Sequence, residues 1–216
     1  MLEAVIDDFC DAVPVHELRS GIRAVSEFLT AVDGQAVGKT RREEPQEHAP
    51  AFDGLTPWQY GYRQARDLRS RLGISGPIPA DLIFILQEAL SFEILPLDAP
   101  AGIEAIAAPG RAHTATFGIT KQIAREESRR FVLCRALSDS LALQTPTLVT
   151  RSQTEHQQRN RAFAAEFLAP AAALRERLPR NRLTEEDLED LAQEFRVSGF
   201  VIRHQVENHQ LATVTE

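Results

Sequence analysis

The 216-residue sequence has only two cysteines, Cys10 and Cys134, which lie far apart in apolar helical patterns. Two such cysteines do not indicate a disulfide framework and are more typical of a protein in a reducing compartment. We therefore expect a cytoplasmic protein. The sequence also lacks any run of 18 apolar residues, and its first residues, MLEAVIDDFCDAV, are acidic where a signal peptide needs positive charge. We therefore expect neither membrane insertion nor export.

Positive charge is also scarce. The chain has 24 Lys and Arg against 31 Asp and Glu, which gives a formal net charge of −7. Nucleic acid and anionic lipid would both be repelled by this overall field, which argues against a protein that coats either one non-specifically. Apolar residues make up 43% and charged residues 25%, proportions typical of a folded globular protein.

The pattern along the chain indicates four parts. Apolar residues at helical spacing on both sides of Pro14 predict two helices, which form an N-terminal extension over 1–32. Residues 33–55 are polar and punctuated by Gly and Pro, which indicates a flexible linker. A main domain is expected over 56–180 and a smaller C-terminal unit over 181–216.

The main domain opens on a predicted helix, which begins after Thr56 with Pro57 and ends at Gly73. Segments rich in Ala, Thr and β-branched residues then predict strands, and helical spacing returns after them. In chain order the predicted elements are a helix near 81–90, a strand at 92–95, two or three short antiparallel strands within 103–119, and helices at 129–143 and 154–168.

The helical pattern at 129–143 carries a motif in outline. The segment RRFVLCRALSDSLAL, which begins at Arg129, resembles the helix R-F-T-L-A-H-E-L-G-H of the ImmA/IrrE family of zinc metallopeptidases and retains its apolar positions. In this register Arg135 replaces the first zinc-binding His, Ala136 replaces the general-base Glu, and Asp139 replaces the second His.

These replacements remove the chemistry of the motif. A zinc peptidase of this type needs two His four residues apart, because one helical turn places both imidazoles about 2.0–2.1 Å from one ion. A guanidinium only donates, so Arg135 would repel a cation, and Ala136 cannot accept a proton from a bound water. We expect no catalytic residue, loss of the family's zinc, and an ion pair between Arg135 and Asp139, one turn apart.

A second segment, NRAFAAEFLAP, resembles the family helix E-A-N-x-F-A-A-E-L-L-x-P, whose first Glu is the third zinc ligand. By that register the ligand position holds Arg159. Several other polar residues could be combined into a different metal site, but none has a diagnostic ligand spacing, and solvated surface groups are the expectation. These residues are His113, Asp139, Glu155, His156 and Glu166.

Nucleophilic chemistry has no better support. Ser138 and Ser140 lie in a helix without a G-x-S-x-G elbow, and Cys134 fills a small apolar position, so all three are expected to be structural. The resemblance covers about Trp58 to Leu211. It implies a zincin-like α+β fold with a small antiparallel sheet, a central helix pair and a helix-turn-helix-like C-terminal unit.

That unit is predicted as two helices, Glu185 to Phe195 and Gly199 to Asn208. The second helix offers Arg203, Gln205 and Asn208 as candidate contacts to nucleic acid. The first helix carries six acidic residues, which would face the phosphate backbone unfavourably, so packing or partner binding is favoured over DNA binding.

The resemblance also implies a biological setting, because active members of the family cleave a helix-turn-helix repressor and so switch on a stress or mobile-element response. For this chain we expect an inactive regulatory module whose former cleft, lined by Arg135, Asp139 and Arg159, holds a protein or peptide, such as a transcriptional repressor, or a small anionic ligand. Two alternatives stay open: a metallo-endopeptidase with non-standard ligands such as Asp139 and Glu155, and a DNA-binding regulator that uses the C-terminal unit.

Overall fold

The computed structural model describes residues 3–34, 54–79, 81, 86–87, 90–109, 115–142, 145–179 and 181–215. Most of the predicted linker at 33–55 and most of the predicted helix near 81–90 lie outside these residues. The described helices are α1 Glu3–Ala12, the 3-10 turn η1 Val15–Glu17, α2 Leu18–Gly34, α3 Pro57–Leu72, α5 Glu126–Ala142, α6 Glu155–Leu168, α7 Ala171–Arg177, α8 Glu185–Phe195 and α9 Gly199–Asn208. The strands are β1 Phe92–Leu97, β2 Ile103–Pro109, β3 Ala115–Thr120, β4 Thr147–Thr150, β5 Arg182–Leu183 and β6 Thr213–Val214.

Four strands form the main sheet, in the order β1-β3-β2-β4. Strand β2 runs antiparallel to β3, as the sequence predicts, and also to β4, which was not predicted as a strand. Strand β1 pairs in parallel with β3, so the sheet is mixed and not wholly antiparallel. The chain reverses after β1, where Gly102 has φ 102°, and reverses again between β2 and β3. Two reversals give β1 and β3 the same direction, and the mixed pairing follows.

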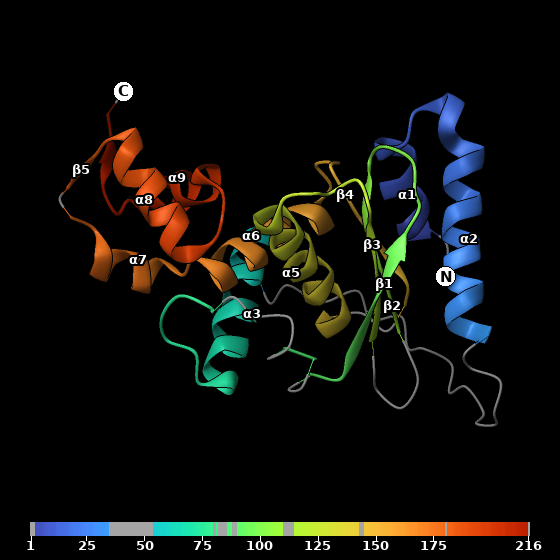
Figure 1. The fold of residues 1–216 in the computed structure, drawn as a ribbon, viewed down its shortest axis with the longest axis horizontal. Coiled ribbons are helices and arrows are strands. Elements are labelled where there is room, and N and C mark those ends of the chain that lie inside the picture. Colours follow the sequence, from blue (N-terminus) through green and yellow to red (C-terminus); the bar gives the residue numbers. More distant parts are fainter. Residues whose placement is uncertain are drawn as a thin grey trace.

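The sheet separates two groups of helices (Figure 1). Side chains alternate along β2, so Ala105 and Ala107 belong to a core shared with α3, α5 and α6, whereas Ile106 and Ala108 belong to a second core. This second core also contains Phe9 of α1, Val13, which follows α1 by one residue, and Phe28 of α2. The two helices predicted on either side of Pro14 are confirmed as α1 and α2, and they cover this second face.

The helix α3 has the start and stop that its sequence predicts. The backbone N–H and hydroxyl of Thr56 both donate to Gln59 Oε1, and Gly73 ends the helix in the left-handed region at φ 67°. It packs closely along α6, since a Cβ added at Gly61 would lie 2.3 Å from the carbonyl oxygen of Arg159. This close crossing fixes the position of α6, which carries much of the site.

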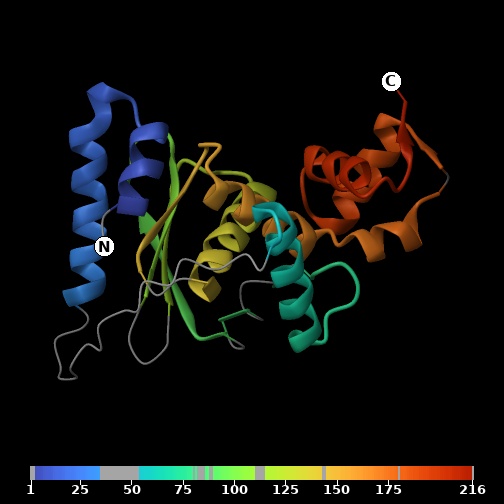
Figure 2. The ribbon, with the colours of Figure 1, turned by 180° about the vertical axis from the view of Figure 1, so that it is seen from behind.

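The C-terminal unit lies beyond α6 and α7, at the opposite end of the molecule from α1 and α2 (Figure 2). Helices α8 and α9 have the predicted bounds, and Thr184 begins α8 by accepting from the backbone N–H of Asp187. Within the described residues, the structure has no helix that is long and apolar enough to span a membrane.

Candidate functional site

The motif residues lie where α5, α6 and β4 meet. Arg135, Ala136 and Asp139 are on α5 and Arg159 is on α6, and each residue is at most 3% exposed. The prediction that two arginines point outward into a cleft is therefore wrong. Their helices pack against each other and against the sheet, so the guanidiniums are enclosed by protein groups rather than by solvent.

Asp139 is the centre of the contacts between α5 and α6. Its Oδ1 accepts from Arg159 Nη2 at 2.5 Å, His156 Nε2 at 2.5 Å and Asn160 Nδ2 at 2.8 Å, and its Oδ2 accepts from Thr147 Oγ1 at 3.0 Å. Burial acts to raise the pKa of this carboxyl, but the charge and hydrogen bond of His156, with the charge of Arg159 and the bond from Asn160, hold it below its usual range. Asp139 is thus a buried, fully engaged anion.

Arg135 turns toward the sheet and not toward Asp139. Its guanidinium donates to the carboxylate of Glu104 on β2, to the Thr150 carbonyl oxygen, and to Gln157 Oε1 at 2.7 Å. The predicted ion pair between Arg135 and Asp139 is therefore wrong, because each has a closer partner on another element. Burial lowers the pKa of Arg135 to about 10 although Glu104 opposes this, so the group stays cationic at neutral pH.

His156 lies between two carboxylates. Its Nε2 contacts Asp139, and its Nδ1 lies 2.7 Å from Oδ2 of Asp8, a residue of α1. Burial favours the neutral ring, but the charge and hydrogen bond of Asp139 and the hydrogen bond of Asp8 outweigh it and raise the pKa of His156 to about 9. Both ring nitrogens therefore donate at neutral pH, and one imidazolium joins α1 to α5 through α6.

Sequence reasoning missed Asp8. Its carboxylate accepts from Thr154 Oγ1 at 2.7 Å, Gln157 Nε2 at 2.9 Å and Ser152 Oγ at 3.4 Å in addition to His156. Burial acts to raise its pKa, but the hydrogen bonds from His156 and Thr154 hold it below the usual range. No local pattern signals this role, because Asp8 precedes His156 by 148 residues.

Two arginines and an alanine at the motif positions do not fit a zinc ion. A guanidinium has no lone pair to offer a metal, and Asp139, the one remaining acceptor, already has four donors. Asp8 and Asp139 contact opposite nitrogens of the His156 ring, so the three side chains do not converge on one point. Among the described residues, no group of three or more His, Cys, Asp and Glu is arranged to hold a metal ion.

The other residues weighed as ligands do not gather at one place. The structure brings Asp139 and His156 together, leaves Glu155 exposed, and places the buried Glu166 elsewhere, in contact with the exposed Arg66 and the buried Gln205. His113 lies outside the described residues.

The three nucleophile candidates, Ser138, Ser140 and Cys134, all lie on α5. Ser138 Oγ donates to Gln64 Oε1 at 2.9 Å, and Ser140 Oγ donates to the Leu137 carbonyl oxygen at 2.9 Å within the helix. Cys134 is buried, and burial raises the pKa of its thiol to about 12. A thiol this hard to ionise is a poor nucleophile at neutral pH.

The candidate nucleic-acid contacts on α9 do not share one outward face. Gln205 is fully buried and donates to Glu166 Oε2 and the Ala169 carbonyl oxygen, both at 2.9 Å, so its placement on the outward face is wrong. It falls one turn after Val201 and beside Val206 on the buried side of the helix. Arg203 pairs with Glu185, and Asn208 donates to the Tyr62 hydroxyl at 3.2 Å. The contacts of Gln205 and Asn208 join α9 to the main domain, and the pair of Arg203 with Glu185 joins α9 to α8.

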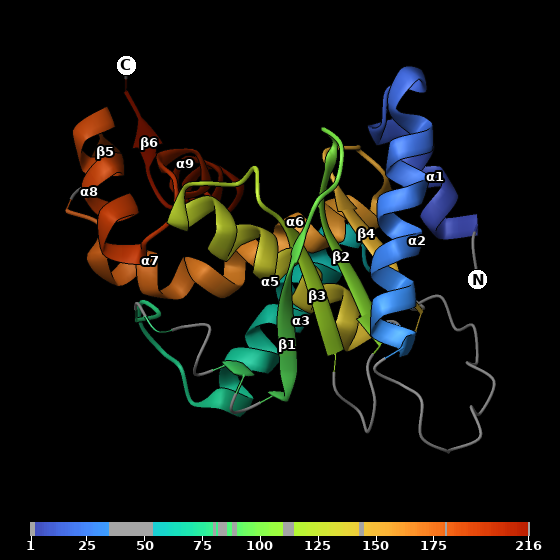
Figure 3. The same cartoon turned by 45° about the vertical axis from the view of Figure 1, so that its right-hand side comes forward.

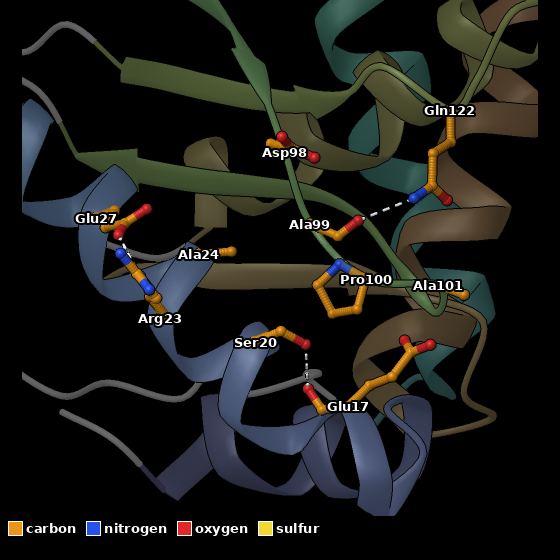
Figure 4. Close-up of a pocket in the computed structure, with 10 residues that line it drawn as sticks. All are labelled: Glu17, Ser20, Arg23, Ala24, Glu27, Asp98, Ala99, Pro100, Ala101 and Gln122. Atoms are coloured by element: carbon orange, nitrogen blue, oxygen red, sulfur yellow. Dashed lines mark hydrogen bonds and ion pairs between the residues drawn. The ribbon is translucent and has the colours of Figure 1, made fainter.

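A surface pocket of about 540 Å³ lies away from this site, between α2 and the loop that follows β1 (Figure 4). Its lining includes the acidic residues Glu17, Glu27 and Asp98, while its one guanidinium, that of Arg23, pairs with Glu27 at 2.7 Å. The pocket is acidic, unlike the anion-binding cleft that the sequence predicts, and contains none of the motif residues.

Comparison with known proteins places the resemblance in the second half of the chain. Residues 113–207 match the model of a peptidase family that is described as the IrrE N-terminal-like domain. This segment includes β3, α5, β4 and α6, and so contains every motif position. The mixed α+β architecture agrees with the zincin-like fold that this family implies. No curated protein matches the chain.

Proposed function

Because residues 113–207 are of the ImmA/IrrE type, we propose that this chain is a catalytically inactive, peptidase-like domain that regulates by binding. Its partner is a protein or peptide, and its setting is cytoplasmic transcriptional or stress control. The setting follows from the family, in which active members act on a repressor.

One observation carries the proposal: at the place of a metal site, the chain has a closed set of internal ion pairs. Asp139 is bound by Arg159 and His156, and Arg135 is bound by Glu104. His156 and Arg159 balance the two carboxylates of Asp8 and Asp139, so the cluster has no net charge when all four are ionised. A divalent cation would need to displace these cations, and no side chain in the cluster is then free to act as general base.

Metal analysis tests this proposal directly. The chain is purified without chelators, its zinc content is measured, and hydrolysis of a fluorescent casein substrate is followed with and without added zinc. We expect zinc far below one equivalent and no zinc-dependent hydrolysis. Stoichiometric zinc in the purified protein would refute the proposal.

Matched variants separate true activity from contamination. Asp139→Asn and Glu155→Gln remove the two carboxylates that an unorthodox metal site would use. If hydrolysis is present and both variants lose it, the chain is an active peptidase. Hydrolysis that neither variant changes comes from another protein and agrees with an inactive domain.

A further inference from the structure

We propose that the segment from Ser152 to Gln157 is a receptor for a carboxylate, that Asp8 of α1 occupies it as an internal ligand, and that an acidic peptide is the external ligand that displaces α1. This inference rests on the proposed binding function and names its site and partner chemistry. Helix α1 is then a tethered competitor for the partner.

The receptor is built from one short stretch of chain. Four donors converge on the Asp8 carboxylate: the hydroxyls of Ser152 and Thr154, the ring nitrogen Nδ1 of His156 and the amide of Gln157. Thr154 is also the N-cap of α6, so the partial positive charge of the helix start adds to these donors. All four donors lie within the family-matched segment, whereas Asp8 lies outside it.

Charge explains why the receptor needs an anion. With Asp8 in place, the cluster of Asp8, Asp139, His156 and Arg159 is neutral, because His156 is protonated at neutral pH. Without Asp8, two cations face one carboxylate, and Thr154, His156 and one N–H of Gln157 lose an acceptor, while Ser152 keeps its hydrogen bond with Thr150. When α1 leaves, water can solvate these donors but carries no charge, and charge-assisted hydrogen bonds to a carboxylate are stronger, so another carboxylate is favoured in the open form.

The manner in which α1 is attached indicates the kind of ligand that replaces it. Phe9, next to Asp8, packs with Val13 into the second core, against a sheet face that includes Leu148 of β4. Asp11 and Cys10 on the same helix are exposed. Helix α1 lies beside β4 (Figure 3). When it leaves, it uncovers both the polar receptor and an apolar surface, which a small carboxylate cannot cover. A peptide with an acidic residue followed by an aromatic one matches both.

The edge of β4 excludes a ligand that binds only by strand addition. The side-chain amide of Gln157 donates to the Leu148 carbonyl oxygen at 2.7 Å and accepts from the Thr150 N–H at 3.1 Å, as a neighbouring strand would. The backbone groups of β4 are thus already occupied at this point. Recognition must come from the carboxylate and the apolar residue beside it.

Chemical rescue tests the receptor in the full-length chain. The variant Asp8→Ala opens a space of the size of a carboxyl group, and acetate serves as the probe at constant ionic strength against chloride. We expect acetate to raise the Tm of Asp8→Ala by roughly 2 °C or more and to leave the wild type unchanged. Asp11→Ala, which removes an exposed carboxylate from the same helix, serves as the matched control and responds as the wild type does.

The pKa of His156, followed by NMR, gives a second measurement that does not depend on stability. It falls in Asp8→Ala and rises again with acetate if the receptor is as proposed. If Asp8→Ala does not fold, the isosteric Asp8→Asn, which leaves no room for acetate, tests only the fall in the His156 pKa, and an unchanged pKa in that variant overturns the proposal. Absence of any acetate effect on both Tm and the His156 pKa overturns the proposal.

A peptide titration tests the partner chemistry. The probe is an N-acetylated, C-amidated pentapeptide, Ala-Asp-Phe-Ala-Ala, compared with the same peptide carrying Asn in place of Asp. We expect the Asp peptide to bind Asp8→Ala at least about tenfold more tightly than the wild type, because the tethered helix reduces the open fraction. We also expect the Asn peptide to lose this advantage, and amide exchange in α1 of the wild type to rise at saturating Asp peptide.

The outcomes are distinct. Equal binding of both peptides, or of the Asp peptide to both proteins, overturns the proposal, and a response to acetate without any to peptide overturns the peptide as partner. None of these measurements depends on activity. Stoichiometric zinc would refute the proposed function, but the acetate response would still show whether the receptor binds a carboxylate.

Discussion

The imidazole of His156 lies 2.5 Å from Asp139, between Nε2 and Oδ1, and the same oxygen accepts from Arg159 at 2.5 Å. In the family register the contact with Arg159 joins the position of the second zinc-binding His to the position of the third ligand. A buried carboxylate between two cations thus cross-links α5 and α6.

Asp139→Asn should destabilise the protein strongly. The substitution leaves the buried guanidinium of Arg159 and the ring of His156 without their shared anion, and a broken buried pair typically costs about 3–5 kcal/mol. Urea unfolding measures the change in the free energy of unfolding. Asp190→Asn, on the exposed face of α8, is the control and should change it by less than about 0.5 kcal/mol. A comparable, small effect at both positions would show that Asp139 does not hold the two helices together.

Stability should fall as pH rises toward 9. The pKa of His156 is about 9 in the folded protein against 6.5 as its ordinary value, so its contribution is full below pH 6.5 and is lost as pH rises through 9. This difference corresponds to about 3 kcal/mol. The groups facing His156 are Asp8 from α1, Asp139 from α5 and Arg159 on its own helix. Asp8 and Asp139 have lowered pKa values, so their contributions are lost only at acid pH.

Urea unfolding between pH 6 and 10 checks this dependence. His156→Gln should be less stable than the wild type near pH 6 and should lose little more as pH rises. His204→Gln is a suitable control, because His204 is exposed on α9, far along the chain from the cluster. A wild-type profile that is flat from pH 7 to 10 would contradict a protonated His156.

Much of the fold follows from local patterns in the sequence. The bounds of α8 and α9 are as predicted, because Thr184 and Ser198 precede clear apolar faces, and α3 lies between the predicted Thr56 and Gly73. The parallel pairing of β1 with β3 was not predicted, since alternation within a strand does not reveal its neighbour.

The site was predictable only in part. The register of the motif places Asp139 and Arg159 correctly at one junction, since they contact each other at 2.5 Å. Their burial was not predicted, because an arginine in a helix is usually exposed and only distant partners such as Glu104 make burial tolerable. Asp8 gave no signal at all, since four donors from another part of the chain define its role.

Restoring the motif should restore a metal site. The combined variant Arg135→His, Ala136→Glu, Asp139→His and Arg159→Glu places two His one turn apart on α5 and a Glu opposite them on α6. Since Asp139 and Arg159 already meet, the new side chains should converge, and we expect about one equivalent of zinc in this variant and far less in the wild type. The version that keeps Asp139 is the control and should bind zinc more weakly. A folded four-site variant, as judged by circular dichroism, that binds no zinc would show that the motif register is wrong.

Gln205 should act on the stability of the C-terminal unit and not on nucleic-acid binding. Gln205→Ala removes the donor to Glu166 and the Ala169 carbonyl oxygen, both buried, and should lower the free energy of unfolding by about 1–3 kcal/mol. Arg203→Ala removes a partly exposed pair with Glu185, which is typically worth less than about 1 kcal/mol, and so serves as the control.

An electrophoretic mobility shift assay with random duplex DNA at two salt concentrations tests nucleic-acid binding by the same unit. We expect no salt-dependent complex with the wild type, because six acidic residues of α8 lie in the same unit as Arg203 and Gln205 and repel the phosphate backbone. A salt-sensitive complex that Arg203→Ala abolishes would instead identify this unit as a DNA-binding surface.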